Sequence, residues 1–182
     1  VTITIIWIGY SLNAQYYKKS QPQPQPVVDD YTKIVLDADY LRTNKIYNEA
    51  FDKYAEAINL DGNRAAAFIG RSGAYYDLGL YEKGIEDANK AVNLEPNNPD
   101  AYSQRAYGYL SLKRYAEAIT DYQKCIDLNP AHQSASYSLS LAYFQISDYK
   151  NALAYINKAI NANPDDFNRY LLRGQIYEKL DE

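Results

Sequence analysis

The chain has 182 residues, a formal net charge of −4 at pH 7 and one cysteine, Cys125. Its length suits a single compact or solenoid domain with an extension. Its 19 lysines and arginines are scattered among 23 aspartates and glutamates, which argues against a nucleic-acid partner, and a lone cysteine excludes an intrachain disulfide and a thiolate zinc cluster.

Residues 1–14 read as an apolar N-terminal arm. Its key apolar residues are Val1, Ile3, Ile5, Trp7 and Ile8. The first four alternate, as on one face of a strand. The arm could be the hydrophobic part of a secretory signal cleaved near Ala14, although it carries no basic leader. A membrane span is not expected in the chain as given, because about nine apolar residues are far fewer than the roughly 20 required. The third interpretation is an arm that is retained and docks on another subunit.

Residues 15–30 form a linker in which Gln21–Pro26 alternates glutamine with proline. Such a composition favours a polyproline-II spacer. At about 3.1 Å per residue the linker would span at most about 50 Å, which is ample to reach a neighbouring subunit.

A 34-residue period begins at Tyr31 and continues to the end of the chain. The units are 31–64, 65–98, 99–132 and 133–166, followed by a half repeat at 167–182, and they align without an insertion or deletion. Small residues recur at positions 8, 20 and 27 of each unit, and tyrosine recurs at position 17. These spacings follow the 3.6-residue period of a helix, and small residues mark the points where two helices approach closely.

Helix boundaries recur with the same period. Position 32 is Gly62, Pro96, Pro130 or Pro164, which ends a helix. The expected N-caps are Asp30, Asn63, Asn98 and Asp166. Each repeat is therefore predicted to hold two antiparallel helices of about three to four turns, joined by a short turn.

These columns of residues resemble the tetratricopeptide repeat (TPR) family over residues 31–182, with near-consensus copies at 65–98 and 99–132. The resemblance implies an all-α, right-handed superhelical solenoid of antiparallel helix pairs, about four and a half units long, which here follows the extended N-terminal arm. The last segment, 167–182, is either the terminal helix that covers the stack or the start of a further repeat. Its apolar residues spread over more than one face, so part of it is expected to touch another chain.

Arginine occurs at position 7 in the second and third repeats, with aspartate at position 23. We expect Arg71 to pair with Asp87 and Arg105 with Asp121. The alternative is a solvated surface charge, for which an ion pair contributes roughly 0–1 kcal/mol.

No catalytic constellation is apparent. The only histidine, His132, falls in a turn between repeats, and Cys125 falls in a small-residue column, which favours a packed core thiol. We therefore expect no enzymatic activity, no cofactor and no metal.

The resemblance also implies that the first helix of each repeat lines a concave groove. The groove residues that it selects are Val35, Ile69, Tyr76, Tyr107, Leu110, Tyr137, Leu141 and Phe144. The Lys/Asn/Arg clamp with which some family members hold acidic peptide tails is missing. Either neighbouring helices bury part of this apolar stripe, or it binds an extended or helical apolar segment, which we favour.

We therefore expect a non-enzymatic protein–protein interaction scaffold whose partner is a separate protein or peptide or further copies of the same chain. An apolar arm, a stiff spacer and an apolar groove in one chain favour self-assembly into a fibre or array, with the arm docked on a neighbouring subunit. The alternative is a monomeric secreted or periplasmic adaptor that binds a separate partner peptide in its groove. A third alternative is an enzyme-associated regulatory fragment of a longer protein. The signal-like arm favours an extracytoplasmic location.

Overall fold

A computed structural model describes residues 28–132 and 134–180, and within these ranges the chain is helical and has no strand. The helices are α2 (Asp30–Thr43), α3 (Tyr47–Leu60), α4 (Ala66–Asp77), α5 (Tyr81–Leu94), α6 (Pro99–Ser111), α7 (Tyr115–Leu128), α8 (Ala135–Gln145), α9 (Tyr149–Ala162) and α10 (Phe167–Lys179). This confirms the predicted all-α fold and the two helices per repeat. The arm and the Gln-Pro part of the linker lie outside the described residues.

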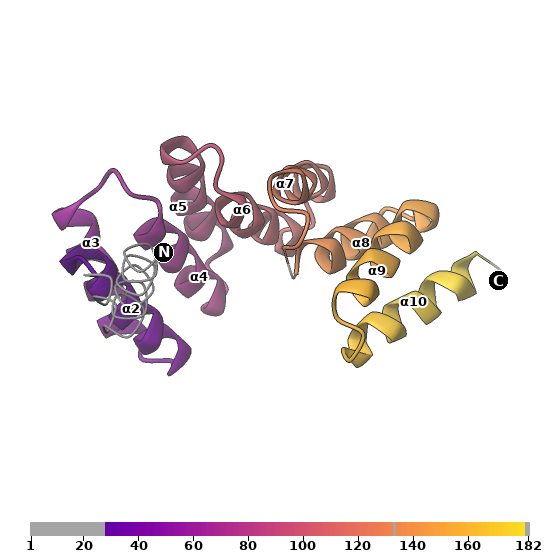
Figure 1. The fold of residues 1–182 in the computed structure, drawn as a ribbon, viewed down its shortest axis with the longest axis horizontal. Helices are drawn as coiled ribbons and strands as arrows, with labels where there is room; N and C mark the ends of the chain where they lie inside the picture. Colours follow the sequence, from indigo (N-terminus) through magenta and orange to yellow (C-terminus); the bar gives the residue numbers. More distant parts are fainter. Residues whose placement is uncertain (1–27, 133, 181–182) are drawn as a thin grey trace, which may run out of the picture.

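The helix pairs follow one another along an arc from α2 to α10 (Figure 1). The first helices of successive repeats contact each other: α2 with α4, α4 with α6, α6 with α8, and α8 with α10. Among the helices that the structure describes, α3, α5, α7 and α9 contact first helices and not one another. The first helices therefore line the inner face of the array and the second helices its outer face, as in a solenoid.

The turn inside each repeat has the same backbone in all four copies. Position 15 has a left-handed φ of 60–73° at Lys45, Gly79, Lys113 and Ser147. The next amide donates back to the carbonyl of position 11 at 2.8–3.0 Å in each case, which closes the first helix in a Schellman-type cap. This shared turn explains how the second helix begins at position 17, a tyrosine, in every complete repeat.

The helix N-termini confirm two of the predicted caps and correct one by a single residue. Asn98 and Asp166 cap α6 and α10 through their side chains. The prediction of Asp30 was wrong: Asp29 caps α2, and Asp30 is the first helical residue. Two adjacent aspartates can serve equally well by chemistry, so only the backbone conformation decides between them.

The prediction that Asn63 caps the next helix was also wrong. The N-cap residue of α4 is Ala65, which has no side chain for the purpose. Instead, the Glu95 carboxylate accepts a hydrogen bond from the Ala65 amide at 3.0 Å, and the Tyr31 hydroxyl accepts one from the Ala67 amide at 2.9 Å. Glu95 at the far end of the same repeat and Tyr31 of the preceding repeat therefore satisfy this helix end, so a local sequence pattern does not reveal them.

The core confirms the role of the small-residue columns, because positions 8, 20 and 27 are buried in all four complete repeats. The largest fully buried side chains include Tyr54, Tyr122, Leu139 and Ile156. Gly174 occupies position 8 of α10, where an added Cβ would meet no atom within 4 Å. The difference arises because the described part of the chain has no second helix of the fifth repeat to pack against α10 at this position.

Helix α10 covers the last helix pair with one face and exposes another. Leu172 and Ile176 are buried against α9, whereas Phe167, Tyr170 and Leu171 are exposed. This confirms that its apolar residues spread over more than one face. Contact of the exposed face with another chain stays a prediction.

Both expected arginine–aspartate pairs are present and bidentate. Arg71 donates to Asp87 from Nε and Nη2 at 2.7 and 2.9 Å. Arg105 donates to Asp121 from Nε and Nη2 at 2.6 and 2.8 Å. Its Nη1 also donates at 3.0 Å to Asn89 of the preceding repeat, so this arginine joins two repeats. The aspartate side chains are only 9% and 7% exposed, which excludes a freely solvated surface charge.

Candidate functional site: the concave groove

The first helices bring the eight predicted groove residues to the inner side of the array, with very different exposure. Val35 and Tyr76 are buried, and Tyr107 is 47% exposed. The half-buried members are Ile69, Leu110, Tyr137, Leu141 and Phe144. Neighbouring helices therefore bury part of the stripe, and the remainder is available to a partner. Whether these residues bind one stays a prediction.

The two buried members have clear structural roles. Val35 packs into the core between α2 and α3. The Tyr76 ring lies directly over Gly84 of α5 and reaches Gly108 of α6, where a Cβ at either glycine would collide with it. Position 24 of the second repeat, to which Tyr76 belongs, is Ala88, whereas the first and third repeats carry tyrosine there. The small residues of α5 thus leave room for a ring that comes from the first helix instead.

One pocket of about 320 Å³ lies on the groove, and we call it the tyrosine pocket. Its aromatic lining is Tyr76, Tyr107 and Tyr122, and its polar lining includes Arg42, Asp77, Ser103, Gln104 and Ser138. The Tyr76 and Tyr107 rings lie 5.3 Å apart between centroids. Burial raises the pKa of the Tyr76 and Tyr122 hydroxyls far above the usual range, so both remain neutral.

The polar side of the tyrosine pocket is electrically balanced. Arg42 Nη1 lies 3.2 Å from Asp77 Oδ2, and both side chains are partly exposed. Gly73 leaves space for the guanidinium in this position, because a Cβ there would lie 2.9 Å from Arg42 Nη1 and the guanidinium would have to shift. Among the described residues, Arg42 Nε and the Tyr76 hydroxyl have no hydrogen-bond partner.

A second pocket, of about 250 Å³, lies farther along α6 and α8. We call it the leucine pocket, because Leu110 and Leu141 form its apolar lining. Its remaining lining residues are Ser111, Lys113, Tyr115 and Gln145. Leu141 also packs on the α9–α10 core beside Phe144, so the pocket is anchored to a rigid part of the fold.

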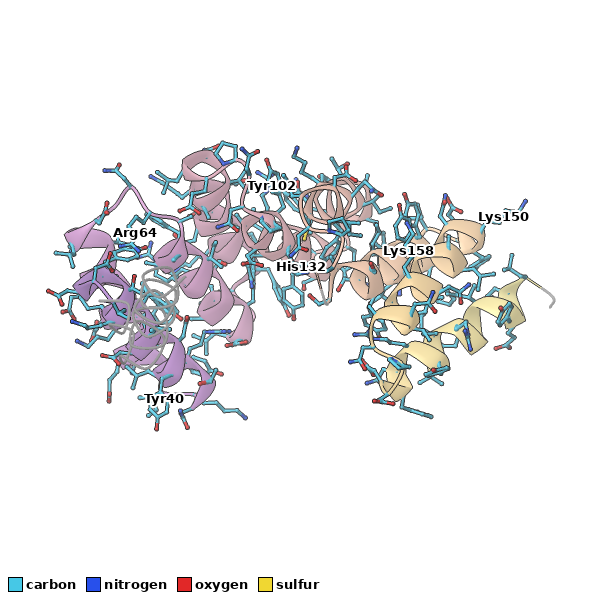
Figure 2. All side chains as sticks on the ribbon, viewed as in Figure 1. Tyr40, Arg64, Tyr102, His132, Lys150 and Lys158 are labelled. Carbon is cyan, nitrogen blue, oxygen red and sulfur yellow. The ribbon has the colours of Figure 1, made fainter. Side chains whose placement is uncertain are left out.

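Neither Cys125 nor His132 lines the tyrosine pocket or the leucine pocket. Cys125 is buried in the core, and burial raises the pKa of its thiol to about 12, which keeps it protonated. His132 lies near the middle of the array in the connection between α7 and α8 (Figure 2), with Nε2 3.1 Å from Asp100 Oδ1. The described residues contain no group of three or more histidine, cysteine, aspartate or glutamate side chains placed to hold a metal ion.

The repeat pattern did not select four residues that line the tyrosine pocket: Gln104, Tyr122, Ser134 and Ser138. Gln104 and Ser138 occupy position 6 of their repeats, and Tyr122 reaches the pocket from α7, a second helix. Position 6 lies about one helical turn before position 9, which holds Tyr107 and Leu141 of the predicted groove, so helical spacing was a usable signal for Gln104 and Ser138. Nothing in the pattern marks Tyr122 as more than a core residue.

An array of paired helices whose first members line one face defines the class of helical-repeat solenoids, which present extended binding surfaces. Sequence comparison places the chain within that class. Family models described as tetratricopeptide repeat match residues 65–98, 99–132 and 134–166, which together make up more than half of the chain. The chain belongs to the tetratricopeptide repeat family, and it is accordingly a protein–protein interaction scaffold.

Solved structures give the same fold. A crystal structure of MamA is 25% identical, with a TM-score of 0.71, over 85% of this chain and 86% of that chain. MamA 41-end from Desulfovibrio magneticus RS-1 is 21% identical, with a TM-score of 0.73, over 84% and 87%. The first TPR of Spaghetti (RPAP3), bound to the HSP90 peptide SRMEEVD, is 23% identical, with a TM-score of 0.64, over 67% and 97%. A search of curated proteins finds no match.

Within the ranges that the structure describes, none of the helices combines the length and the apolar character needed to cross a membrane.

Proposed function

We propose that copies of this chain assemble with one another, with the N-terminal arm (residues 1–14) of one copy docked in the groove of the next. The observation that carries this proposal is the leucine pocket, an apolar recess in a chain that also carries an apolar arm. The isoleucines of the arm match the side chains of Leu110 and Leu141 in chemistry and size. The linker is long enough to present the arm to a neighbouring copy.

The expected affinity is modest. Burial of a valine or isoleucine side chain contributes about 1.5–3 kcal/mol. Three such side chains would supply about 5–9 kcal/mol, and association costs at least about 4 kcal/mol. Assembly should therefore depend strongly on concentration. Because arm and groove are different surfaces, the contact is head-to-tail and extends into a fibre or array unless it closes into a ring.

Light scattering at several protein concentrations tests this proposal. The average molar mass measured for the full chain should increase with its concentration, whereas a chain lacking residues 1–14 should stay monomeric. Ser111→Arg, which fills and charges the leucine pocket, should also prevent assembly. Ala116→Arg on α7 is the matched control, because Ala116 is exposed on a second helix, and it should assemble normally. If deletion of residues 1–14 leaves the assembly size unchanged, the proposal is wrong.

The second candidate is a monomeric adaptor that binds a separate partner peptide in the groove. The structure of RPAP3 bound to the HSP90 peptide SRMEEVD supports it as a mode of binding for this fold. The groove of this chain has Val35, Ile69, Ser103 and Tyr137 at position 5, which favours a partner other than an acidic tail. A constant monomer mass at all concentrations would favour this candidate over self-assembly.

We also propose an extracytoplasmic location, secreted, periplasmic or at the cell surface. The support is the apolar start of the arm, which resembles the hydrophobic part of a secretory signal. Fractionation of the source cells tests this location, and recovery of the protein only with cytoplasmic markers would contradict it.

A further inference from the structure

We propose that the tyrosine pocket binds the Gln-Pro segment, Gln21–Pro26, of a second copy of this chain. The inference rests on the proposed self-assembly and assigns a chemical basis to one part of it. Proline-rich segments bind grooves lined by aromatic rings, because the flat pyrrolidine faces pack on them and the polyproline-II backbone is already extended. The chain contains both the segment and such a lining.

The aromatic lining is arranged to receive flat, uncharged groups. Tyr107 is 47% exposed and lies beside Tyr76, which is held rigid by burial. Tyr122 adds a third ring at the pocket, also buried. A rigid floor with one accessible ring provides an anchor that loses little side-chain entropy when a partner binds.

The electrostatic balance of the pocket matches an uncharged ligand. The Arg42 guanidinium is already paired with Asp77 at 3.2 Å, so an acidic peptide would meet the repulsion of Asp77 as well as the attraction of Arg42. Gln21–Pro26 has no charged side chain. The pocket therefore favours a ligand for its shape and its uncharged polar groups rather than for its charge.

Hydrogen bonding is also complementary. Proline has no N–H group, so a Gln-Pro repeat offers backbone carbonyl acceptors that no regular secondary structure satisfies. The pocket offers donors on its rim, namely the Arg42 guanidinium, the Gln104 amide and the Ser103 and Ser138 hydroxyls. One turn of polyproline II is three residues and about 9 Å long, and a pocket of about 320 Å³ is large enough to receive side chains from one such turn.

The reach of the chain favours a second copy over the same copy. Arg42 lies twelve residues beyond Asp30 on α2, which corresponds to about 18 Å along the helix. Pro26 is four residues before Asp30, so the connecting chain spans at most about 14 Å. Pro26 therefore cannot reach the pocket of its own chain; only the start of the segment has the length to do so, since Gln21 lies nine residues before Asp30 and could span at most about 32 Å. In a neighbouring copy this limit does not apply, and the arm that precedes the segment can continue to the leucine pocket, since Tyr107 and Leu110 lie one turn apart on α6.

The test uses the full chain with Pro22, Pro24 and Pro26 all replaced by alanine, so that its own segment does not compete. A fluorescent peptide with the sequence of residues 19–28 is titrated with this variant and its anisotropy is followed. The peptide should bind saturably. A control peptide with alanine in place of the three prolines should bind at least about tenfold more weakly, because the flat rings and the extended backbone are lost.

Adding Tyr107→Ala to the variant should weaken binding of the proline peptide by about tenfold. Tyr40→Ala is the control, because Tyr40 is 68% exposed at the end of α2 and does not line the pocket (Figure 2); it should change the affinity less than twofold. Equal binding of the two peptides, no saturable binding of the proline peptide, or no effect of Tyr107→Ala would overturn the inference.

Failure of the proposed self-assembly can be distinguished from failure of this inference. If deletion of residues 1–14 prevents assembly while the proline peptide does not bind, self-assembly stands and the inference is wrong. If the proline peptide binds as described but the full chain stays monomeric, recognition of the segment stands and self-assembly through the arm is wrong.

Discussion

The Arg105–Asp121 pair is predicted to behave as a buried ion pair, so that removing one partner alone destabilises the protein more than replacing both. The Asp121 side chain is 7% exposed and accepts two hydrogen bonds from Arg105, at 2.6 and 2.8 Å. Arg105→Leu would leave this carboxylate buried and unpaired and would remove the donor to Asn89. Losing one partner of a buried pair costs about 3–5 kcal/mol. We expect about 3 kcal/mol here, because Arg105 is 19% exposed and the site is close to water.

The chain contains its own control for this experiment. The fourth repeat has Leu139 and Tyr155 at the positions of Arg105 and Asp121, and Leu139 is fully buried beside Tyr155. Arg105→Leu combined with Asp121→Tyr copies that apolar solution into the third repeat. Replacing a buried ion pair by packed apolar residues is often nearly neutral. The free energy of unfolding of the double variant should therefore lie within about 1 kcal/mol of the wild-type value. The single variant should be clearly less stable than both.

Urea unfolding followed by circular dichroism measures these differences. With a slope of about 2 kcal/mol per molar urea, a loss of about 3 kcal/mol lowers the midpoint by about 1.5 M. An Arg105→Leu variant within 1 kcal/mol of the wild type would refute the reasoning, since that is the value of an exposed pair. A double variant as unstable as the single variant would refute the apolar replacement.

Three further predictions concern single groups. Cys125 should resist alkylation in the folded protein and react only on unfolding, because its thiol is buried and its pKa is raised to about 12; rapid modification under native conditions would contradict this. Hydrogen bonds from Thr32 lower the pKa of Asp29 from 3.8 to about 2, so its contribution to stability should be complete above about pH 4 and be lost as the pH falls through about 2. Acid titration of Asp29→Ala should lack that loss. Tyr76→Phe should stabilise the protein by about 1 kcal/mol because the buried hydroxyl has no partner among the described residues, whereas Tyr54→Phe should destabilise it because its hydroxyl donates to a carboxylate; thermal unfolding distinguishes the two.

Features that repeat in register could be predicted from the sequence. The helix pairs, the buried small-residue columns and the arginine–aspartate pairs all follow from residues that recur every 34 positions. Arg71 and Arg105 were informative because each lies sixteen residues before an aspartate on the facing helix. A repeated fold converts such spacings into repeated contacts.

Features that depend on one particular place in the array could not be predicted from the sequence. Glu95, at the far end of the same repeat, and Tyr31, in the preceding repeat, satisfy the start of α4, which no local capping pattern indicates. Lys45 and Lys113 adopt the left-handed backbone that usually indicates glycine, so the shared turn was hidden by its side chains. Tyr76 is buried only because glycine and alanine in α5 leave space for its ring.

Cross-linking tests the central claim, arm-in-groove assembly, most directly. Full chains carrying Trp7→Cys are mixed with full chains carrying Gln145→Cys, at the edge of the leucine pocket, and oxidised mildly. Lys150→Cys on α9 is the control, because Lys150 is exposed on a second helix. We predict disulfide-linked pairs of Trp7→Cys and Gln145→Cys chains, identified by mass spectrometry, and few such pairs with Lys150→Cys. Equal yields with both positions, or no linked pairs at concentrations where the wild type assembles, would contradict docking of the arm in the groove.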